Sequence, residues 1–150
     1  MLRKEIVVHP GAAVILPLLD DQTIVMVRNQ RPAAGGMLLE LPAGTLEPGE
    51  PPEGCAAREL TEETGYRAKT LRKLVDFYSS PGICTERMFA FVAEGLEPAR
   101  QDLDEGEELV VERVTWGEAL RMVQANEIRD GKSIAALLYY HTFRNQRGRV

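Results

Sequence analysis

The sequence predicts a single domain of the α/β or α+β class, in which strands and helices share one hydrophobic core. The 150 residues are a usual length for one domain and suffice to bury such a core. Neither an internal repeat nor a linker divides the chain. We therefore treat residues 1–150 as one folding unit.

Short apolar segments rich in β-branched residues predict the strands. His9-Pro10-Gly11 separates the first two segments, and Asp20-Asp21 indicates a turn after the second. A loop is expected at residues 32–36, because it contains proline and glycine. The expected strands cover residues 5–8, 12–19, 23–28, 37–41, 71–78, 88–93 and 109–116.

Three further segments predict helices. Residues 51–64 begin with two prolines, which a first helical turn tolerates, and end before Gly65, a natural helix stop. Residues 117–126 carry apolar side chains at helical spacing. A last helix follows Asp130 or Ser133, because either side chain can cap its first turn.

The first predicted helix carries three carboxylates on one face. Glu59, Glu62 and Glu63 are three and four residues apart, so they lie within about a third of the helix circumference. Like charges at this spacing repel by roughly 0.2–0.5 kcal/mol per pair. A divalent cation reverses that sign, and oxygen ligands point to Mg²⁺ or Mn²⁺. Taken alone, three carboxylates at this spacing are more often simply a solvated acidic face.

A longer pattern surrounds these carboxylates, and it resembles the signature of the Nudix hydrolases. The resemblance extends from Arg3 onward. It implies an α/β/α sandwich with a mixed β-sheet, and metal-dependent hydrolysis of a nucleoside diphosphate linked to another moiety. The fixed members of the pattern are, in order, Gly44, Glu50, Arg58, Glu59, Glu62, Glu63 and Gly65.

The resemblance implies a role for each carboxylate on the helix. Glu59 and Glu63 match the metal ligands of the family, and Glu62 matches a ligand or an orienting carboxylate. The expected cofactor is Mg²⁺, with Mn²⁺ as an alternative.

Supporting groups follow from the same resemblance. Arg58 and Glu50 match an ion pair that stabilises the signature. The backbone carbonyl of Ala43, just before the signature glycine, matches a further metal ligand. From spacing alone, Pro42-Ala43-Gly44 is equally an ordinary loop.

Two arginines precede the signature. Residues 27–31 and 38–44 resemble the ADP-ribose pyrophosphatase branch of the family, in which the arginine that matches Arg31 contacts the substrate. Arg28 is a second candidate, since an arginine fork suits phosphate oxygens. Either side chain can instead be a surface charge, the usual fate of arginine.

Residues 80–86 also resemble that branch. Pro81 would stiffen a loop that faces the signature helix and so shape the pocket for a terminal ribose. Ser80-Pro81-Gly82 is also simply a good turn sequence. Glu86 matches a substrate-contacting position of the branch.

Residues 101–108 form an acidic segment, which is usually a solvated loop. In the branch that it resembles, the corresponding loop supplies a general base and another metal ligand. The resemblance assigns these roles to Glu105 and Glu107, and Gly106 gives the loop mobility.

Composition excludes several classes of protein. The net charge of −5 argues against binding to a nucleic-acid backbone. The longest apolar run, residues 11–19, is too short to span a membrane. Cys55 and Cys84 are too few for a disulfide framework, so a cytoplasmic setting is expected. The sequence contains neither a nucleophile elbow nor a Walker-type phosphate loop, which disfavours covalent catalysis.

The resemblance thus implies hydrolysis of ADP-ribose to AMP and ribose 5-phosphate. Alternatives are another nucleoside diphosphate sugar, such as ADP-glucose or GDP-mannose, and a ligand sensor without turnover. The complete set of signature carboxylates argues against the sensor.

The branch usually begins with extra N-terminal strands that build the dimer and the adenine pocket, whereas residues 1–11 can add only one strand. We therefore expect a homodimer that recognises the diphosphate and the terminal sugar more strictly than the base.

Overall fold

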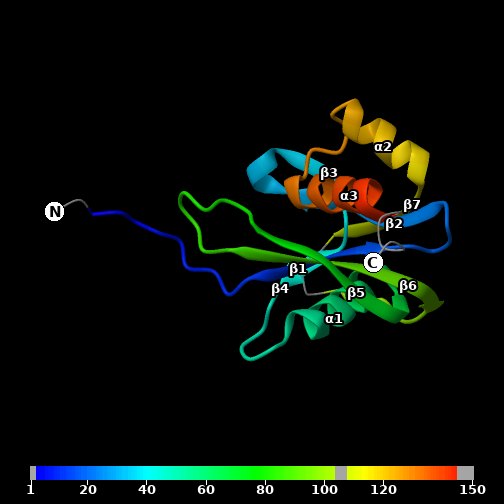
Figure 1. Ribbon diagram of the computed structural model, residues 1–150, viewed down its shortest axis with the longest axis horizontal. Helices are drawn as coiled ribbons and strands as arrows, with labels where there is room; N and C mark the ends of the chain where they lie inside the picture. Colours follow the sequence, from blue (N-terminus) through cyan, green and yellow to red (C-terminus); the bar gives the residue numbers. More distant parts are fainter. Residues whose placement is uncertain (1–2, 104–107, 145–150) are drawn as a thin grey trace.

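The structure is a computed structural model of the chain, and residues 3–103 and 108–144 are described. Helix α1 lies on one side of the strands, and α2 and α3 lie on the other (Figure 1). The strands are β1 (Ala12–Pro17), β2 (Thr23–Arg31), β3 (Gly36–Glu40), β4 (Ala43–Thr45), β5 (Tyr66–Tyr78), β6 (Arg87–Pro98) and β7 (Leu109–Thr115). The helices are α1 (Pro52–Thr64), α2 (Trp116–Gln124), α3 (Gly131–Phe143) and a short 3₁₀ turn, η1 (Pro32–Ala34).

The strands form two sheets. The larger has the order β4-β1-β6-β5, in which β1 and β6 are parallel and the other pairs are antiparallel. The smaller has the order β3-β2-β7 and is antiparallel throughout. The predicted mixed sheet between layers of helices is therefore confirmed.

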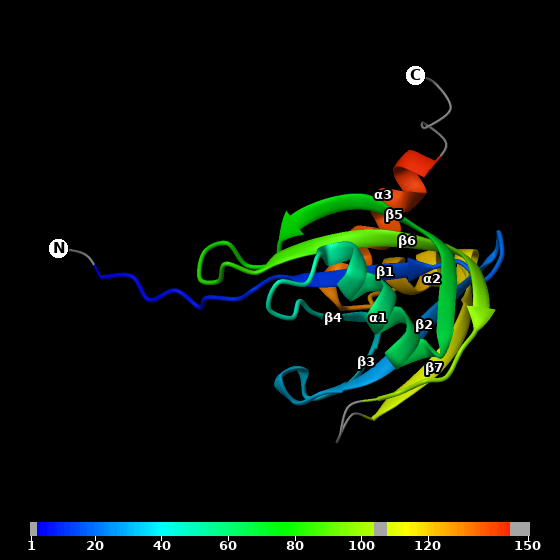
Figure 2. The ribbon, with the colours of Figure 1, turned by 90° about the horizontal axis from the view of Figure 1, so that it is seen from below.

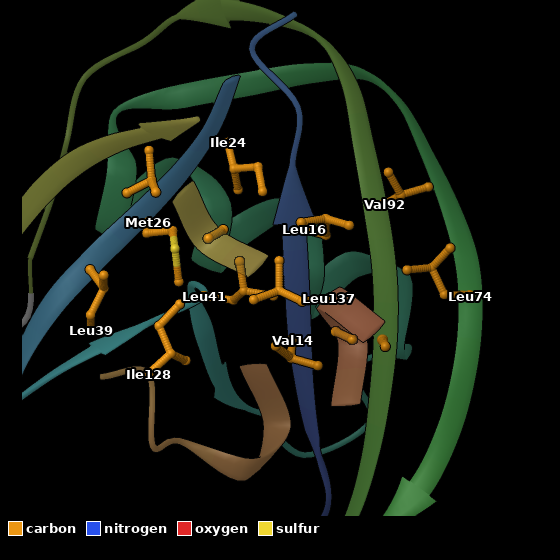
Figure 3. Close-up of a cluster of buried hydrophobic side chains, with 14 of the residues drawn as sticks. Val14, Leu16, Ile24, Met26, Leu39, Leu41, Leu74, Val92, Ile128 and Leu137 are labelled. Carbon is orange, nitrogen blue, oxygen red and sulfur yellow. The ribbon is translucent and has the colours of Figure 1, made fainter. Parts of the chain in front are cut away.

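Strand β1 is buried along its whole length because both of its faces are covered. Successive side chains of a strand point to opposite faces. Val14 and Leu16 belong to a core that includes residues of both sheets and of α3, and Figure 3 shows part of this core. Ala13 and Ile15 belong to a second core, beneath α1. The central strand thus fixes the sheet against helices on both sides.

The prediction of a strand at residues 5–8 is wrong. This segment projects from the body of the molecule beside the β5–β6 turn (Figures 1 and 2), and only Val7 forms an isolated bridge, with Cys84. The amide of Val7 donates to the carbonyl of Ile83, and the carbonyl of Val7 accepts from the amide of Thr85. Residues 6–8 are exposed, because no helix or sheet covers them.

Other differences concern the ends of elements. Strands β5 and β6 extend beyond the predicted residues 71–78 and 88–93, because they pair with each other along almost their whole length. The backbone hydrogen bonds of this pairing extend the strands into polar stretches in which apolar residues do not alternate. Asp130 caps α3, since its carboxylate accepts from the amide of Ser133 at 3.0 Å. No helix in the described ranges is long and apolar enough to cross a membrane.

Candidate active site

Helix α1 carries the signature, and its sequence fixes both ends. Pro51 and Pro52 occupy the start, where the first amides need no helical partner. Gly65 ends the helix in the left-handed conformation, with φ of 70° and its amide donating to the carbonyl of Thr61. Leu60, fully buried, holds the helix against the larger sheet.

One guanidinium organises the carboxylates around α1. Arg58 bonds to both oxygens of Glu50, at 2.9 and 3.0 Å. Its Nη1 donates to Glu59 at 2.7 Å and to Glu62 at 3.0 Å. These bonds to Arg58 lower the pKa of Glu50 to about 2, and they raise the pKa of Arg58. Charge on three acidic side chains is therefore offset at one point.

Strand β4 lies directly against this carboxylate cluster. The amide of Ala43 donates to Glu63 Oε2 at 3.0 Å, and Glu63 is only 4% exposed. A Cβ atom on Gly44 would lie 1.8 Å from Glu59 Oε1. Only glycine therefore allows Glu59 to keep its present position. This local reason explains why a glycine stands at the start of the signature.

The oxygen atoms between α1 and β4 are of the kind that bind a hard divalent cation. Carboxylate oxygens of Glu59 and Glu63 meet the backbone of β4, and oxygen donors are those that Mg²⁺ prefers. Within the described ranges, however, no three His, Cys, Asp or Glu side chains are placed to hold an ion by themselves. Glu59 is turned to Arg58 and Glu63 to the amide of Ala43.

A cavity of about 610 Å³ is lined in part by β4. It contains two residues predicted to contact substrate, Arg31 and Glu86. The cavity is lined by Arg31, Ala43, Gly44, Thr45, Phe77, Tyr78, Ser79, Glu86, Met88, Asp130, Gly131, Lys132 and Ala135. Because Ala43 and Gly44 also touch α1, the cavity and the carboxylate cluster share one wall.

The two predicted arginines have different surroundings. Arg31 lines the cavity, whereas Arg28 forms a two-bond pair with Glu112 of β7 at 2.5 and 3.1 Å and is not among the lining residues. Residues three apart in a strand point to opposite faces, so Arg28 and Arg31 cannot share a site on β2. Pro81, in the exposed β5–β6 turn, is likewise not among the lining residues.

Sequence reasoning missed Glu40 and Lys132. Glu40 is 1% exposed and accepts from Arg31 at 2.9 and 2.8 Å and from Lys132 at 2.7 Å. Burial opposes ionisation of Glu40, but the two cations outweigh it and lower the pKa of that carboxyl. A lone acid between apolar neighbours, as in residues 38–41, was the available signal.

The first residues of the acidic segment, which follows β6 in the sequence, lie beside the C-terminal end of α1. Gln101 Nε2 donates to the carbonyl of Glu63 at 2.7 Å, and the amide of Asp102 donates to the carbonyl of Glu62 at 3.0 Å. The chain therefore enters this segment beside the carboxylate cluster. Glu105 and Glu107 themselves lie outside the described residues.

Comparison with known proteins identifies the family to which this chain belongs. The model of the family described as NUDIX domain matches residues 8–137. The chain belongs to the Nudix family. It is 44% identical to an ADP-ribose pyrophosphatase of Bacillus subtilis (strain 168) over 139 residues, which are 91% of this chain and 75% of that relative. It is 38% identical to a GDP-mannose pyrophosphatase of Citrobacter koseri over 141 residues, 88% and 73% of the two chains.

A solved structure supports the same fold. The crystal structure of an ADP compounds hydrolase matches this chain with a TM-score of 0.83 and 26% identity. The match covers 93% of this chain and 75% of the other. The Nudix assignment thus rests on the fold as well as on the sequence.

The Nudix ion pair between Glu50 and Arg58 predicts a pH dependence. The pKa of Glu50 falls from 4.5 to about 2 on folding, so the pair stabilises the fold fully above pH 4.5, and this contribution is lost as the pH falls towards 2. Glu50→Gln removes the ionisation. In urea unfolding with a chelator present, wild type should exceed the variant in stability at pH 6, and the difference should shrink between pH 4.5 and 2. A difference that does not change with pH would contradict this account.

Proposed function

We propose that this Nudix protein is a metal-dependent pyrophosphatase that cleaves ADP-ribose to AMP and ribose 5-phosphate. One observation carries the proposal: β4 is both a wall of the cavity and the strand that touches the carboxylate cluster of α1. A diphosphate bound in the cavity therefore lies beside carboxylates that can hold a divalent cation. The name of the Bacillus subtilis relative supports ADP-ribose as the substrate.

The second candidate is hydrolysis of another nucleoside diphosphate sugar, such as GDP-mannose or ADP-glucose. The name of the Citrobacter koseri relative supports GDP-mannose. A ligand sensor without turnover is disfavoured, because every carboxylate of the signature is present.

Mg²⁺ is the proposed cofactor, and Mn²⁺ prefers similar ligands. Glu59, Glu63 and the backbone of β4 would hold it, with Glu62 as a ligand or an orienting carboxylate. A cation held there supplies positive charge to the diphosphate oxygens and lowers the pKa of a bound water. Arg58 and Glu50 keep Glu59 and Glu62 in place by the bonds described above.

Substrate contacts are proposed for the residues that line the cavity. Arg31 lines the cavity with its guanidinium side chain. Glu86, in the turn between β5 and β6, also lines the cavity, and its carboxylate lies 3.6 Å from the imidazole of His9. Contacts from Arg28 and Pro81 have no support from the cavity lining.

We also propose a homodimer. Apolar side chains of the projecting N-terminal segment, of the end of β5 and of the β5–β6 turn are exposed in the single chain, and a second copy would cover them. A single species near 16.7 kDa by light scattering would contradict the dimer. The exposed apolar residues are Ile6, Val7, Val8, Tyr78 and Ile83.

A cytoplasmic location is also proposed. Cys55 and Cys84 are free thiols, which fits the cytoplasm.

The function is tested with a substrate panel. With Mg²⁺ present, the protein should convert ADP-ribose to AMP and ribose 5-phosphate, and its kcat/KM for GDP- and UDP-linked sugars should lie within about 10³-fold of that value, some 4 kcal/mol. Nucleoside triphosphates and diadenosine polyphosphates should be poor substrates. Product analysis by chromatography checks the bond cleaved. Preferential hydrolysis of triphosphates would refute the proposal, and a stronger adenine preference would refute only the loose recognition of the base.

The contact between Gly44 and Glu59 gives a second prediction. In Gly44→Ala the three atoms nearest the new Cβ all belong to the flexible end of Glu59, so we expect the carboxylate to move while the fold is retained. Misplacement of a group by about 1 Å can lower turnover about 10²-fold. Kinetics and thermal unfolding of Gly44→Ala are compared with those of Gly36→Ala, whose Cβ meets no atom within 4 Å. Equal activity of the two variants would show that this contact has no role.

Glu105 is the proposed general base and Glu107 a further ligand. The described chain enters their segment beside α1, which supports the assignment. Glu105→Gln should lower kcat by about 10²–10⁴-fold with little change in KM, the usual effect of losing a general base. Glu107→Gln is the matched variant, since it makes the same change two residues away. If only Glu107→Gln shows this loss of kcat, the two roles are assigned wrongly.

A further inference from the structure

Glu40 is a buried carboxylate with two cationic partners from different parts of the chain. Arg31, at the end of β2, bonds to both of its oxygens, and Lys132, in the first turn of α3, bonds to one of them. Arg31 Nη2 and Lys132 Nζ bond to the same atom, Glu40 Oε2, at 2.8 and 2.7 Å. The guanidinium and the ammonium are therefore neighbours.

Stability alone gives little reason for this arrangement. Burying charged groups is costly, and well-packed apolar residues often serve a fold as well or better. Here the carboxylate is shielded, with its side chain 2% exposed, while the side chains of Arg31 and Lys132 are 43% and 16% exposed. The two cations also line the cavity, whereas Glu40 does not. The arrangement thus presents positive groups to the cavity from a buried negative anchor.

Neighbouring carboxylates hold the pair in place. Lys132 Nζ also bonds to Asp130 at 2.9 Å, and Asp130 is fixed in turn by capping α3. The hydrogen bonds of Arg31 to Glu40 raise the pKa of that guanidinium, and the charges of Asp130 and Glu63 add to the effect. Both cations are therefore held at the wall of the cavity.

We propose that Arg31 and Lys132 form a two-cation clamp for the diphosphate of the substrate, and that Glu40 is the positioning residue that holds both cations in place. The proposal rests on the proposed function of the cavity. A planar guanidinium and a compact ammonium suit the several oxygens of a diphosphate. Without Glu40 the two cations would repel each other and lose their common anchor. Lys132 touches the substrate in this account, whereas Glu40 acts only through its partners.

The experiment compares Lys132→Gln, Lys132→Arg and Glu40→Gln in full-length protein with Mg²⁺. Measured quantities are kcat and KM for ADP-ribose, the inhibition constant of ADP, and the unfolding temperature. Glu127→Gln is the control, because Glu127 pairs with Arg121 through two bonds at the surface and does not line the cavity.

Lys132→Gln should raise both KM and the inhibition constant of ADP about 10-fold, the effect of one lost hydrogen bond to a charged group. Its kcat should change little, and Lys132→Arg should recover most of the affinity. Glu40→Gln should raise the same constants at least as much. Adding Lys132→Gln to Glu40→Gln should then have little further effect, because residues that act together are not additive. Glu127→Gln should match wild type within about twofold.

Unchanged KM and ADP affinity in Lys132→Gln would overturn the clamp, as would failure of Lys132→Arg to recover affinity. A loss of stability without any change in affinity would show that Glu40 serves only the fold. If Glu40→Gln does not fold, the two Lys132 variants decide. If wild type hydrolyses no nucleotide sugar, the proposed function fails, and calorimetry of ADP binding to the same variants still tests the clamp.

Discussion

The structure of the site depends on the guanidinium of Arg58. It bonds to Glu50, Glu59 and Glu62, which would otherwise repel one another at the edge of α1. The same side chain donates to the carbonyl of Thr45 at 3.2 Å, so it ties the helix to the end of β4. A single cation thereby fixes the acidic side chains and the strand that they face.

Strand β4 connects this cluster with the rest of the proposed site. At Gly44 the absence of a side chain lets Glu59 approach the strand closely, and the amide of Ala43 donates a hydrogen bond to Glu63. The same strand lines the cavity, as do Arg31 and Lys132, which both bond to Glu40. Carboxylates suited to a cation therefore contact this short strand, and positive groups suited to a diphosphate line the same cavity as the strand.

Local signals in the sequence predicted the parts that depend on local physics. The prolines and Gly65 correctly marked the two ends of α1, and the spacing of Glu59, Glu62 and Glu63 placed these carboxylates on one face of the helix. Strand alternation, applied to β2, would also have separated Arg28 from Arg31. Residues 5–8 have the composition of a strand, but the surroundings that decide burial are tertiary.

Long-range pairing was beyond reach of the sequence alone. Glu40 and Lys132 are 92 positions apart, and the bond between them requires β3 and the start of α3 to meet. The acid among apolar residues at 38–41 signalled an unusual position but not its partners. Likewise, Pro42-Ala43-Gly44 looked like a loop, and only pairing with β1 makes strand β4 of residues 43–45.

The central claim is that the carboxylates of α1 and strand β4 form one divalent-cation site. Equilibrium binding of Mn²⁺, followed by its electron paramagnetic resonance signal, tests this most directly. Wild type should bind Mn²⁺ saturably, and Glu63→Gln, whose amide oxygen can still accept from Ala43, should bind it at least about 10-fold more weakly. Glu53→Gln, the same change in the exposed first turn of α1, should leave binding unchanged. Equal Mn²⁺ affinity of wild type and Glu63→Gln would contradict the account.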